Sequence, residues 1–350
     1  MRLKKRYIVR TVIGIVFGFL LLGLGFAINQ YYRLEVSNFR SWDGKEHSYK
    51  IYPGATIDSV MNLIRAEYEI GSEANFSLHT RMFLFNYPEP GHYTFPAQIG
   101  DKELINRLKY GIQTPVRITW NNSARTTHEL AEKVTTNLLM DQETLFLLLD
   151  SNEYMAAYGM DRETSRCLFI PNTYEVMWDI KPDALFRRMQ REYNAFWNES
   201  RRHKADSIGL TPIEVAIVAS IVEGETYRKS DMPLIASLYI NRLHKGMPLQ
   251  ACPTIKYAVG DFNLKRVLYR HLKVESPYNT YKNKGLPPGP IRCPLPSTMD
   301  FVLSAPKTDY LYMCANPALD GTHIFSSSYG KHTSAAHEYH RMMNETSKQK

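Results

Sequence analysis

Many of the motifs that identify ligand-dependent enzymes are absent from this sequence. It has no glycine-rich phosphate loop, no dinucleotide fingerprint, and neither the H-E-x-x-H nor the H-x-x-E-H zinc pattern. These absences argue against nucleotide-dependent, NAD-dependent and zinc-dependent chemistry, and we expect no cofactor and no metal ion. Cysteine is scarce, with no metal-type spacing among Cys167, Cys252, Cys293 and Cys314. Their spacing leaves both disulfides and buried free thiols open.

Acidic residues are missing from the first ten positions, where most of the excess positive charge lies. The chain has 43 Lys and Arg against 35 Asp and Glu, a formal net charge of +8. Five of the cations are Arg2, Lys4, Lys5, Arg6 and Arg10, and without them 38 cations face 35 acids, a balance of +3. No basic run interleaved with aromatic residues follows, so we expect no nucleic-acid partner.

Charged residues are also missing from 11–28, TVIGIVFGFLLLGLGFAI, and this run is just long enough to cross a bilayer. A cleavable signal peptide is disfavoured, because the run is long for its apolar core and no A-x-A-like site follows. We therefore predict a cytoplasmic basic tail over 1–10 and a single-pass anchor over 11–32 in the plasma (inner) membrane. Because the cations stay in the cytoplasm, the rest of the chain is predicted to be periplasmic or extracellular.

Beyond the anchor, 38–46 is polar and is predicted to be a linker. Two similar segments follow, each with a strand, a helix and a Pro-Gly pair at one end of the strand. HSYKIYPGA precedes a helix over 56–66, and PGHYTFPAQ precedes the helical segment IGDKELINRLKYG. These segments predict either two small strand–helix modules or one module with a swapped strand.

The most informative stretch is 211–226, TPIEVAIVASIVEGET, an apolar helix that ends in two carboxylates. Thr211 as N-cap, Pro212 at the first helical position and Glu214 predict a capping box. Glu223 and Glu225 are two residues apart and point about 200° away from each other around a helix. Different roles are therefore expected for the two acids. An acid whose pKa is raised by apolar surroundings suits general acid cleavage of a glycosidic bond.

Loop-rich segments downstream of this helix are suited to a sugar ligand. Flat faces for pyranose rings are offered by Trp178, Tyr257, Tyr278 and Tyr281. Directed hydrogen bonds are offered by Asn241, Arg242, Gln250 and Asn279. Packing within an aromatic-rich core is the alternative explanation for each aromatic residue.

At these residues the sequence closely resembles the endolytic murein transglycosylases of the MltG/YceG-like family. The matching segments are ordered along most of the chain and follow the N-terminal anchor. They are IYPGATIDSVMNLI, PGHYTFP, FIPNTYEV, ASIVEGET, ASLYINRLHKGMPLQ, PTIKYAVG, SPYNTY, GLPPGPI and YLYMCA…GTHIFSSSYGKH. The resemblance implies a membrane-anchored lyase that cuts nascent peptidoglycan strands internally and leaves 1,6-anhydro-N-acetylmuramyl ends.

The resemblance also implies roles for the residues named above. The family's catalytic glutamate falls on Glu223, which would protonate the glycosidic oxygen and then accept the proton of the muramyl C6 hydroxyl. Water is not the nucleophile, so a second carboxylate is unnecessary and Glu225 is expected to be supporting. Peptidoglycan strands are the expected partner, peptidoglycan synthases are further candidates, and chain termination is a candidate role. The sequence departs from the family pattern at Asn172, Ala251, Cys252 and Lys331.

Together these arguments predict an α+β protein in which a LysM-like module over 47–122 precedes a YceG-like catalytic domain over 123–345. Three rival functions stay open. A hydrolase using the same acid would yield reducing ends, and a non-catalytic peptidoglycan-binding scaffold would leave the glycan intact. A metallohydrolase would have to use His332, His337 and His340, and it would be inhibited by chelators.

Overall fold

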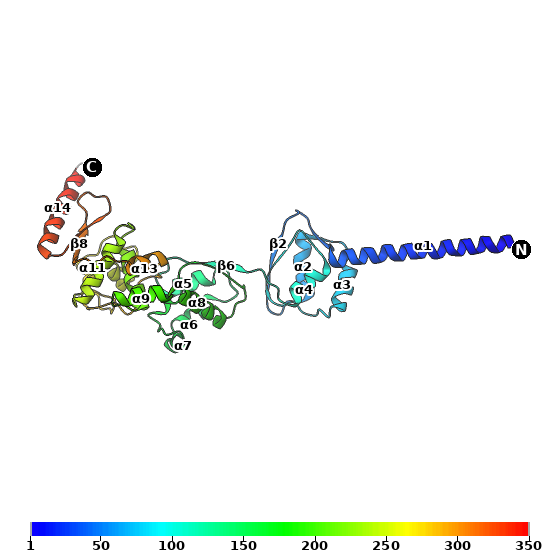
Figure 1. The fold of residues 1–350 in the computed structure, drawn as a ribbon, viewed down its shortest axis with the longest axis horizontal. Coiled ribbons are helices and arrows are strands. Elements are labelled where there is room, and N and C mark those ends of the chain that lie inside the picture. Colours follow the sequence, from blue (N-terminus) through cyan, green and yellow to red (C-terminus); the bar gives the residue numbers. More distant parts are fainter. Residues whose placement is uncertain (1, 349–350) are drawn as a thin grey trace. The chain divides into compact units, whose positions relative to one another are not determined.

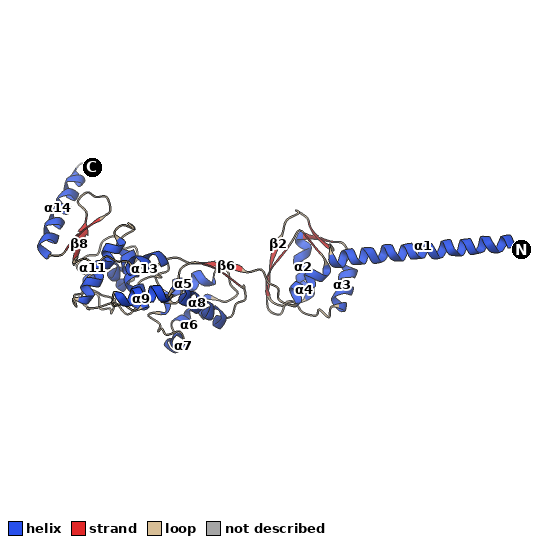
Figure 2. Cartoon of the chain, in the orientation of Figure 1, coloured by secondary structure: helices blue, strands red, loops and turns tan. Residues whose placement is uncertain are grey.

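The computed structural model describes the backbone of residues 2–348 and the side chains of residues 8–343. It is a mixed α+β protein with small sheets, as predicted (Figures 1 and 2). Two compact units divide the chain. The first comprises Met1–Val116 and Glu175–Asp179, and the second comprises Arg117–Tyr174 and Ile180–Lys350.

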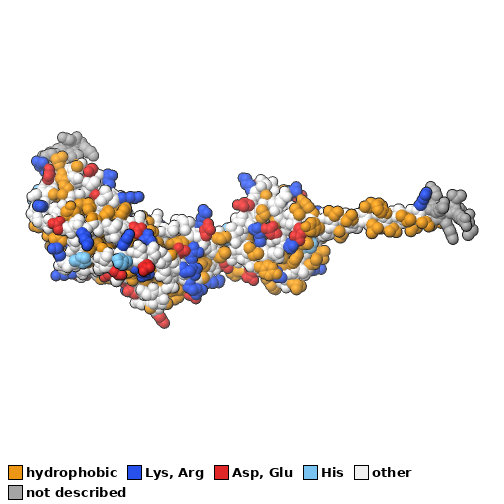
Figure 3. Space-filling view, viewed as in Figure 1, with side chains coloured by type: hydrophobic (Ala, Val, Ile, Leu, Met, Phe, Trp, Pro, Cys, Tyr) orange, Lys and Arg blue, Asp and Glu red, His pale blue; other side chains and the backbone are white. Residues whose placement is uncertain are grey.

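The long apolar run lies in helix α1 (Arg2–Glu35). Its segment Ile8–Glu35 is long and apolar enough to cross a membrane, and its apolar window is not buried inside the protein. Apolar side chains cover this segment of α1 in the space-filling view (Figure 3). Because the helix rises about 1.5 Å per residue, its 28 residues exceed the ~30 Å hydrocarbon core. The side chains of Arg2, Lys4, Lys5 and Arg6 lie outside the described residues.

Besides α1, the first unit contains two small antiparallel sheets and three helices. Its elements are β1 (Phe39–Ser41), β2 (His47–Ile51), α2 (Ile57–Glu67), β3 (Tyr68–Ile70), α3 (Glu73–Met82), β4 (Gly91–Phe95), β5 (Gln98–Ile99) and α4 (Asp101–Lys109). One sheet has the order β3-β1-β5, and β2 pairs with β4 in the other. Because β2 and β4 come from the two similar segments and share one core, these segments form one module.

The predicted linker over 38–46 is wrong, because this segment belongs to the folded unit. Phe39 is fully buried in β1, and Asn38 donates to Asp101 at 2.7 Å. Asp101 also pairs with His79 at 2.5 Å, and both side chains are buried. Arg33 of α1 donates to Asn38 at 3.0 Å, which ties the end of α1 to this network. Asn38 and Ser41 are therefore buried polar residues of the folded unit, whereas the turn over 42–46 is exposed.

The second unit is mainly helical. Its helices are α5 (Thr127–Thr135), α6 (Gln142–Leu149), α7 (Asn152–Ala156), α8 (Pro182–Phe196), α9 (Glu199–Ser207), α10 (Pro212–Glu225), α11 (Met232–His244), α12 (Cys252–Val259), α13 (Pro296–Leu303) and α14 (Tyr329–Lys348). Strands β8 (Tyr312–Ala315) and β9 (His323–Ser326) form an antiparallel hairpin. Strands β6 (Val116–Thr119) and β7 (Thr173–Val176) form another pair, where the chain passes from one unit to the other.

Helix α10 is the central element of the second unit and packs against α9, α11, α12 and α13. Every residue from Val215 to Glu223 is buried, which explains why the helix is apolar on nearly all faces. The predicted capping box is confirmed, because Thr211 accepts from the backbone of Glu214 and the Glu214 carboxylate accepts from the backbone of Thr211. This packing fixes the positions of the two acids at the end of the helix.

The four cysteines are free thiols in this structure. Cys167 and Cys293 are buried, Cys314 is partly buried, and Cys252 is exposed at the start of α12. Of the two possibilities that the spacing left open, the structure therefore has free thiols, two of them buried.

Candidate active site

The two acids at the end of α10 border different cavities. Glu225 borders a cavity of about 380 Å³, here called the Glu225 pocket, and Glu223 borders one of about 120 Å³, the Glu223 hollow. Gly224 separates them and lies against Pro253 at the start of α12. The opposite directions expected from helix geometry thus lead to two separate cavities.

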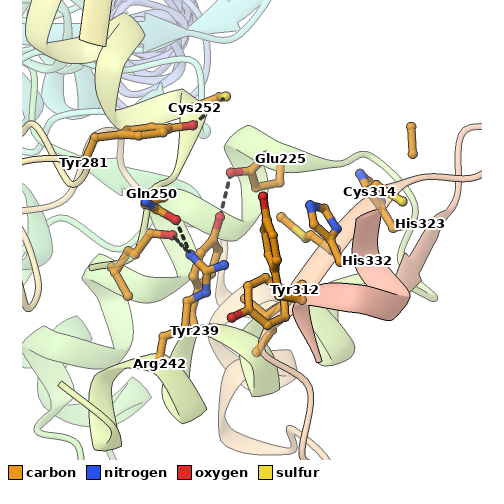
Figure 4. A pocket seen from close by; sticks show the side chains of 15 residues that line it. Glu225, Tyr239, Arg242, Gln250, Cys252, Tyr281, Tyr312, Cys314, His323 and His332 are labelled. Carbon is orange, nitrogen blue, oxygen red and sulfur yellow. Dashed lines mark hydrogen bonds between the residues drawn. The ribbon is translucent and has the colours of Figure 1, made fainter. Parts of the chain in front are cut away.

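The Glu225 pocket is built from segments far apart in the sequence (Figure 4). Helices α10 and α11 supply Glu225, Tyr239 and Arg242, and the loop before α12 supplies Gln250. The β8–β9 hairpin and α14 supply the opposite side, including Tyr312 and His332. Asp231 stabilises this side, because its carboxylate accepts from the backbone of His323 at 2.9 Å and pairs with its ring.

Glu225 combines a raised pKa with an available oxygen. Burial raises the pKa of this carboxyl, against the hydrogen bond from Tyr239 and the charges of His323, Lys256 and Arg242. The Tyr239 hydroxyl donates to Oε1 at 2.6 Å. Among the described residues, Oε2 has no hydrogen-bond partner, and the residue is only partly buried. The carboxyl can therefore hold a proton and present it to a ligand in the pocket.

Replacing Tyr239 tests how this pKa is set. Tyr239→Phe removes a donor that stabilises the charged carboxylate, so the pKa of Glu225 is expected to rise further and its titration to move to higher pH. The carboxylate infrared band, followed against pH as a difference from Glu225→Gln, measures the shift. An unchanged or lower midpoint would show that the Tyr239 hydrogen bond does not control this group.

Arg242 brings a buried positive charge to the same pocket. It is 7% exposed and donates to the carbonyls of Leu311 at 2.7 Å and Leu249 at 2.8 Å. Its guanidinium also approaches Gln250 Oε1 at 3.3 Å. Gln250 has a φ of 53°, a left-handed conformation that is uncommon outside glycine and is frequent at functional sites. Arg242 thus holds the strained loop that presents Gln250 to the pocket.

The remaining predicted residues are distributed over several environments. Tyr281 lines the Glu225 pocket, and Tyr257 lines the Glu223 hollow. Asn241 donates to the carbonyls of Thr308 and Tyr310, and the fully buried Asn279 donates to those of Leu272 and Val274. Tyr278 is 6% exposed and donates to Glu163 at 2.8 Å. Hydrogen bonds within the protein thus occupy Asn241, Tyr278 and Asn279.

Trp178 is not available as a sugar-stacking face. It is 1% exposed and packs edge-on against Tyr52 at 5.0 Å, within the first unit. An aromatic residue in an extended segment is equally compatible with packing and with binding, and here packing is the outcome.

Glu223 is more deeply buried than Glu225. It is 4% exposed, and its Oε1 accepts from the backbone of Leu295 at 2.7 Å. Burial raises its pKa, against the Leu295 N–H, the side chains of Thr298 and Asn122, and the charge of Arg292. Its Oε2 is buried and has no hydrogen-bond partner among the described residues. One oxygen of Glu223 is therefore occupied by a backbone N–H, and the other is buried.

Sequence reasoning missed several residues of these two cavities, among them Tyr239, Tyr312, His323, Arg125 and Arg292. Tyr239, Tyr312 and His323 lie within the segments that match the family, and Arg292 follows one of them directly. Their position in these segments could have identified them as candidates. The histidines at the C-terminal end were considered as metal ligands. Within residues 8–343, no three His, Cys, Asp or Glu side chains are grouped to hold a metal ion.

Comparisons with known proteins give consistent results. The sequence model of the YceG-like family matches residues 49–338. An endolytic murein transglycosylase of Bacillus subtilis (strain 168) is 37% identical over 162 residues, 46% of this chain and 43% of that protein. One from Streptococcus pneumoniae (strain D39 / NCTC 7466) is 34% identical over 138 residues, 38% of this chain and 24% of that protein. The match thus spans less than half the length of either relative.

A solved structure shares the fold. The crystal structure of a YceG-like protein from Listeria monocytogenes matches with a TM-score of 0.54 at 24% sequence identity. The match covers 83% of this chain and 98% of that chain, so it extends over both units.

Proposed function

This chain belongs to the YceG-like family, and from that membership we propose that it is an endolytic murein transglycosylase. The reaction is cleavage of the MurNAc–GlcNAc bond within nascent peptidoglycan strands, with 1,6-anhydroMurNAc ends as product. The names of the two curated relatives support this proposal. The observation that carries it is Glu225, a carboxyl with a raised pKa and an available oxygen in a pocket of about 380 Å³.

Glu225 is our candidate for the acid, in place of Glu223. A general acid must reach the glycosidic oxygen, and the unpartnered oxygen of Glu223 is buried. The volume of about 120 Å³ beside Glu223 is also small for a sugar ring, whereas the Glu225 pocket additionally contains Arg242, Gln250 and Tyr281. The sequence-based assignment to Glu223 stays the alternative, supported by the raised pKa of that carboxyl.

The proposed reaction needs one carboxyl and no water. Protonated Glu225 gives its proton to the glycosidic oxygen as the bond between that oxygen and C1 of MurNAc breaks. The C6 hydroxyl oxygen of the same sugar then bonds to C1, and its proton passes to the Glu225 carboxylate. This closes the 1,6-anhydro ring and restores the starting protonation state. Tyr239 orients the carboxyl by its hydrogen bond, and Gln250 is positioned to bind the sugar.

Product analysis tests this function. Full-length protein in detergent is incubated with uncrosslinked glycan strands, and the new ends are measured by mass spectrometry. We expect ends that are one water lighter than reducing ends, with no effect of a chelator. Reducing ends would indicate a hydrolase, an intact strand would indicate a binding scaffold, and chelator inhibition would indicate a metallohydrolase.

The other parts of the proposal concern location and binding. Helix α1 is proposed to anchor the protein in the plasma membrane with its N-terminus in the cytoplasm and both units outside, supported by the length and exposure of its apolar segment. The region 47–122 is proposed as a LysM-like glycan-binding module, supported by its shared core, and 123–345 as the catalytic domain. Peptidoglycan synthases are the proposed partners.

A further inference from the structure

The Glu223 hollow is lined by three cations that have no ion-pair partner. They are Arg125, Lys256 and Arg292, and none of them forms a salt bridge within residues 8–343. The Nε atoms of both arginines are buried without a hydrogen-bond partner. Burial lowers the pKa of Arg292, the charge of Glu223 opposes this shift, and the neighbouring charge of Arg125 adds to it. Buried donors and like charges of this kind are costly unless a counter-charge is present.

A fourth cation lies behind the hollow. Arg166 is 3% exposed, donates to Thr127 Oγ1 at 3.0 Å and to the Pro290 carbonyl, and lies 5.7 Å from the Tyr257 ring centroid. It has no carboxylate partner among the described residues. Glu223 is the one acid that lines the hollow, and its Oε1 already accepts from Leu295. Positive charge therefore exceeds negative charge around this cavity.

The size and place of the hollow restrict what it can hold. About 120 Å³ accommodates a carboxylate or phosphate group. The rim includes Tyr227, which is 94% exposed, so a ligand can approach from solvent. Gly224 and Pro253 form the boundary towards the Glu225 pocket. A glycan strand bound in the Glu225 pocket would therefore place its nearby acidic groups close to the hollow.

We propose that the Glu223 hollow is an anion subsite, in which Arg125, Lys256 and Arg292 bind an acidic group of the strand that is cleaved in the Glu225 pocket. This inference rests on the proposed function. Two groups of a nascent strand have the required chemistry: the carboxylates of its peptide stems and the pyrophosphate of a lipid-linked end. Both supply oxyanions that guanidinium groups bind through paired hydrogen bonds.

The variant Arg125→Gln tests the subsite, because Arg125 is absent from the groups that set the pKa of Glu225. Full-length protein is assayed on three glycan substrates. The first carries peptide stems and a lipid-linked end, and the second carries peptide stems and a free end. The third has a free end and has lost its peptide stems to an amidase. We expect KM to rise about tenfold where the bound group is present, with kcat little changed, because the variant loses a charge-assisted hydrogen-bonding group. Arg125→Lys should restore part of the affinity, and Lys265→Gln, an exposed cation outside the hollow, should match the wild type.

The three strands assign the bound group. A defect on both peptide-bearing strands but not on the stripped one indicates peptide carboxylates, and a defect confined to the lipid-linked strand indicates pyrophosphate. An equal defect on all three strands, or none, would overturn the subsite. A binding measurement separates failure of the subsite from failure of the proposed function, because binding requires no cleavage. The same glycan substrates are bound to Glu225→Gln protein with and without the Arg125→Gln exchange.

Discussion

Glu225→Gln is expected to reduce the formation of anhydro ends at least about a thousandfold. The amide keeps the shape of the side chain and can still accept from Tyr239, but it can neither donate a proton to the leaving oxygen nor accept one from the C6 hydroxyl. Both roles fall on one group, so the loss should lie at the upper end of general acid–base effects, which span ~10²–10⁴. The rate of anhydro-end formation by mass spectrometry, under saturating glycan, is the measurement.

Glu223→Gln is the matched control for that experiment. The variant amide can still accept from the Leu295 backbone, and the unpartnered oxygen of the carboxyl that it replaces is buried. We expect activity within about tenfold of the wild type. If instead Glu223→Gln abolishes cleavage and Glu225→Gln does not, the chemistry belongs to Glu223 and the acid assigned from the pocket geometry is wrong.

Gly224→Ala is expected to give the second largest effect. An added Cβ would lie 2.5 Å from Pro253 Cβ and 2.7 Å from its Cγ, and a proline ring cannot rotate away. Helix α12 must therefore shift, and it carries residues of both cavities, including Cys252 and Lys256. We expect about a hundredfold loss of activity, because displacements near 1 Å have such effects, and ~2 kcal/mol less stability from overpacking.

Gly330→Ala is the control for the effect of a glycine-to-alanine change in a helix without a steric clash. Gly330 lies in α14, and nothing approaches an added Cβ within 4 Å, so helix propensity should leave the protein as stable or slightly more stable. Urea unfolding followed by circular dichroism, together with the glycan assay, compares both variants with the wild type. Wild-type stability and activity of Gly224→Ala would show that the contact with Pro253 is not tight in solution.

Local patterns predicted the central helix well. Thr211, Pro212 and Glu214 specify its start through contacts between residues near in sequence, and the structure has the capping box that they predict. Helix geometry also predicted that Glu223 and Glu225 point apart. Which of them faces a large cavity depends on the β8–β9 hairpin and α14, which follow about a hundred residues later. No local pattern carries that information.

The same limit explains the errors elsewhere. The segment 38–46 is polar enough for a linker, but Asn38 and Ser41 are buried through partners that come later in the chain, such as Asp101 for Asn38. Helix α3 was not predicted, although Ser72 caps it and Phe76 is buried in the core. Its apolar residues do not form a continuous stripe, so tertiary contacts decide its conformation.

The hydrogen bonds that join α1 to the first unit have a mechanical consequence. Arg33 bonds to Asn38, which bonds to the buried Asp101–His79 pair, so no flexible tether lies between the helix and this unit. If α1 anchors the protein as proposed, motion of the helix in the bilayer carries the first unit with it as one body. The search for a glycan strand would then be lateral diffusion at a fixed height above the lipid, and membrane thickness and helix tilt would help to set that height.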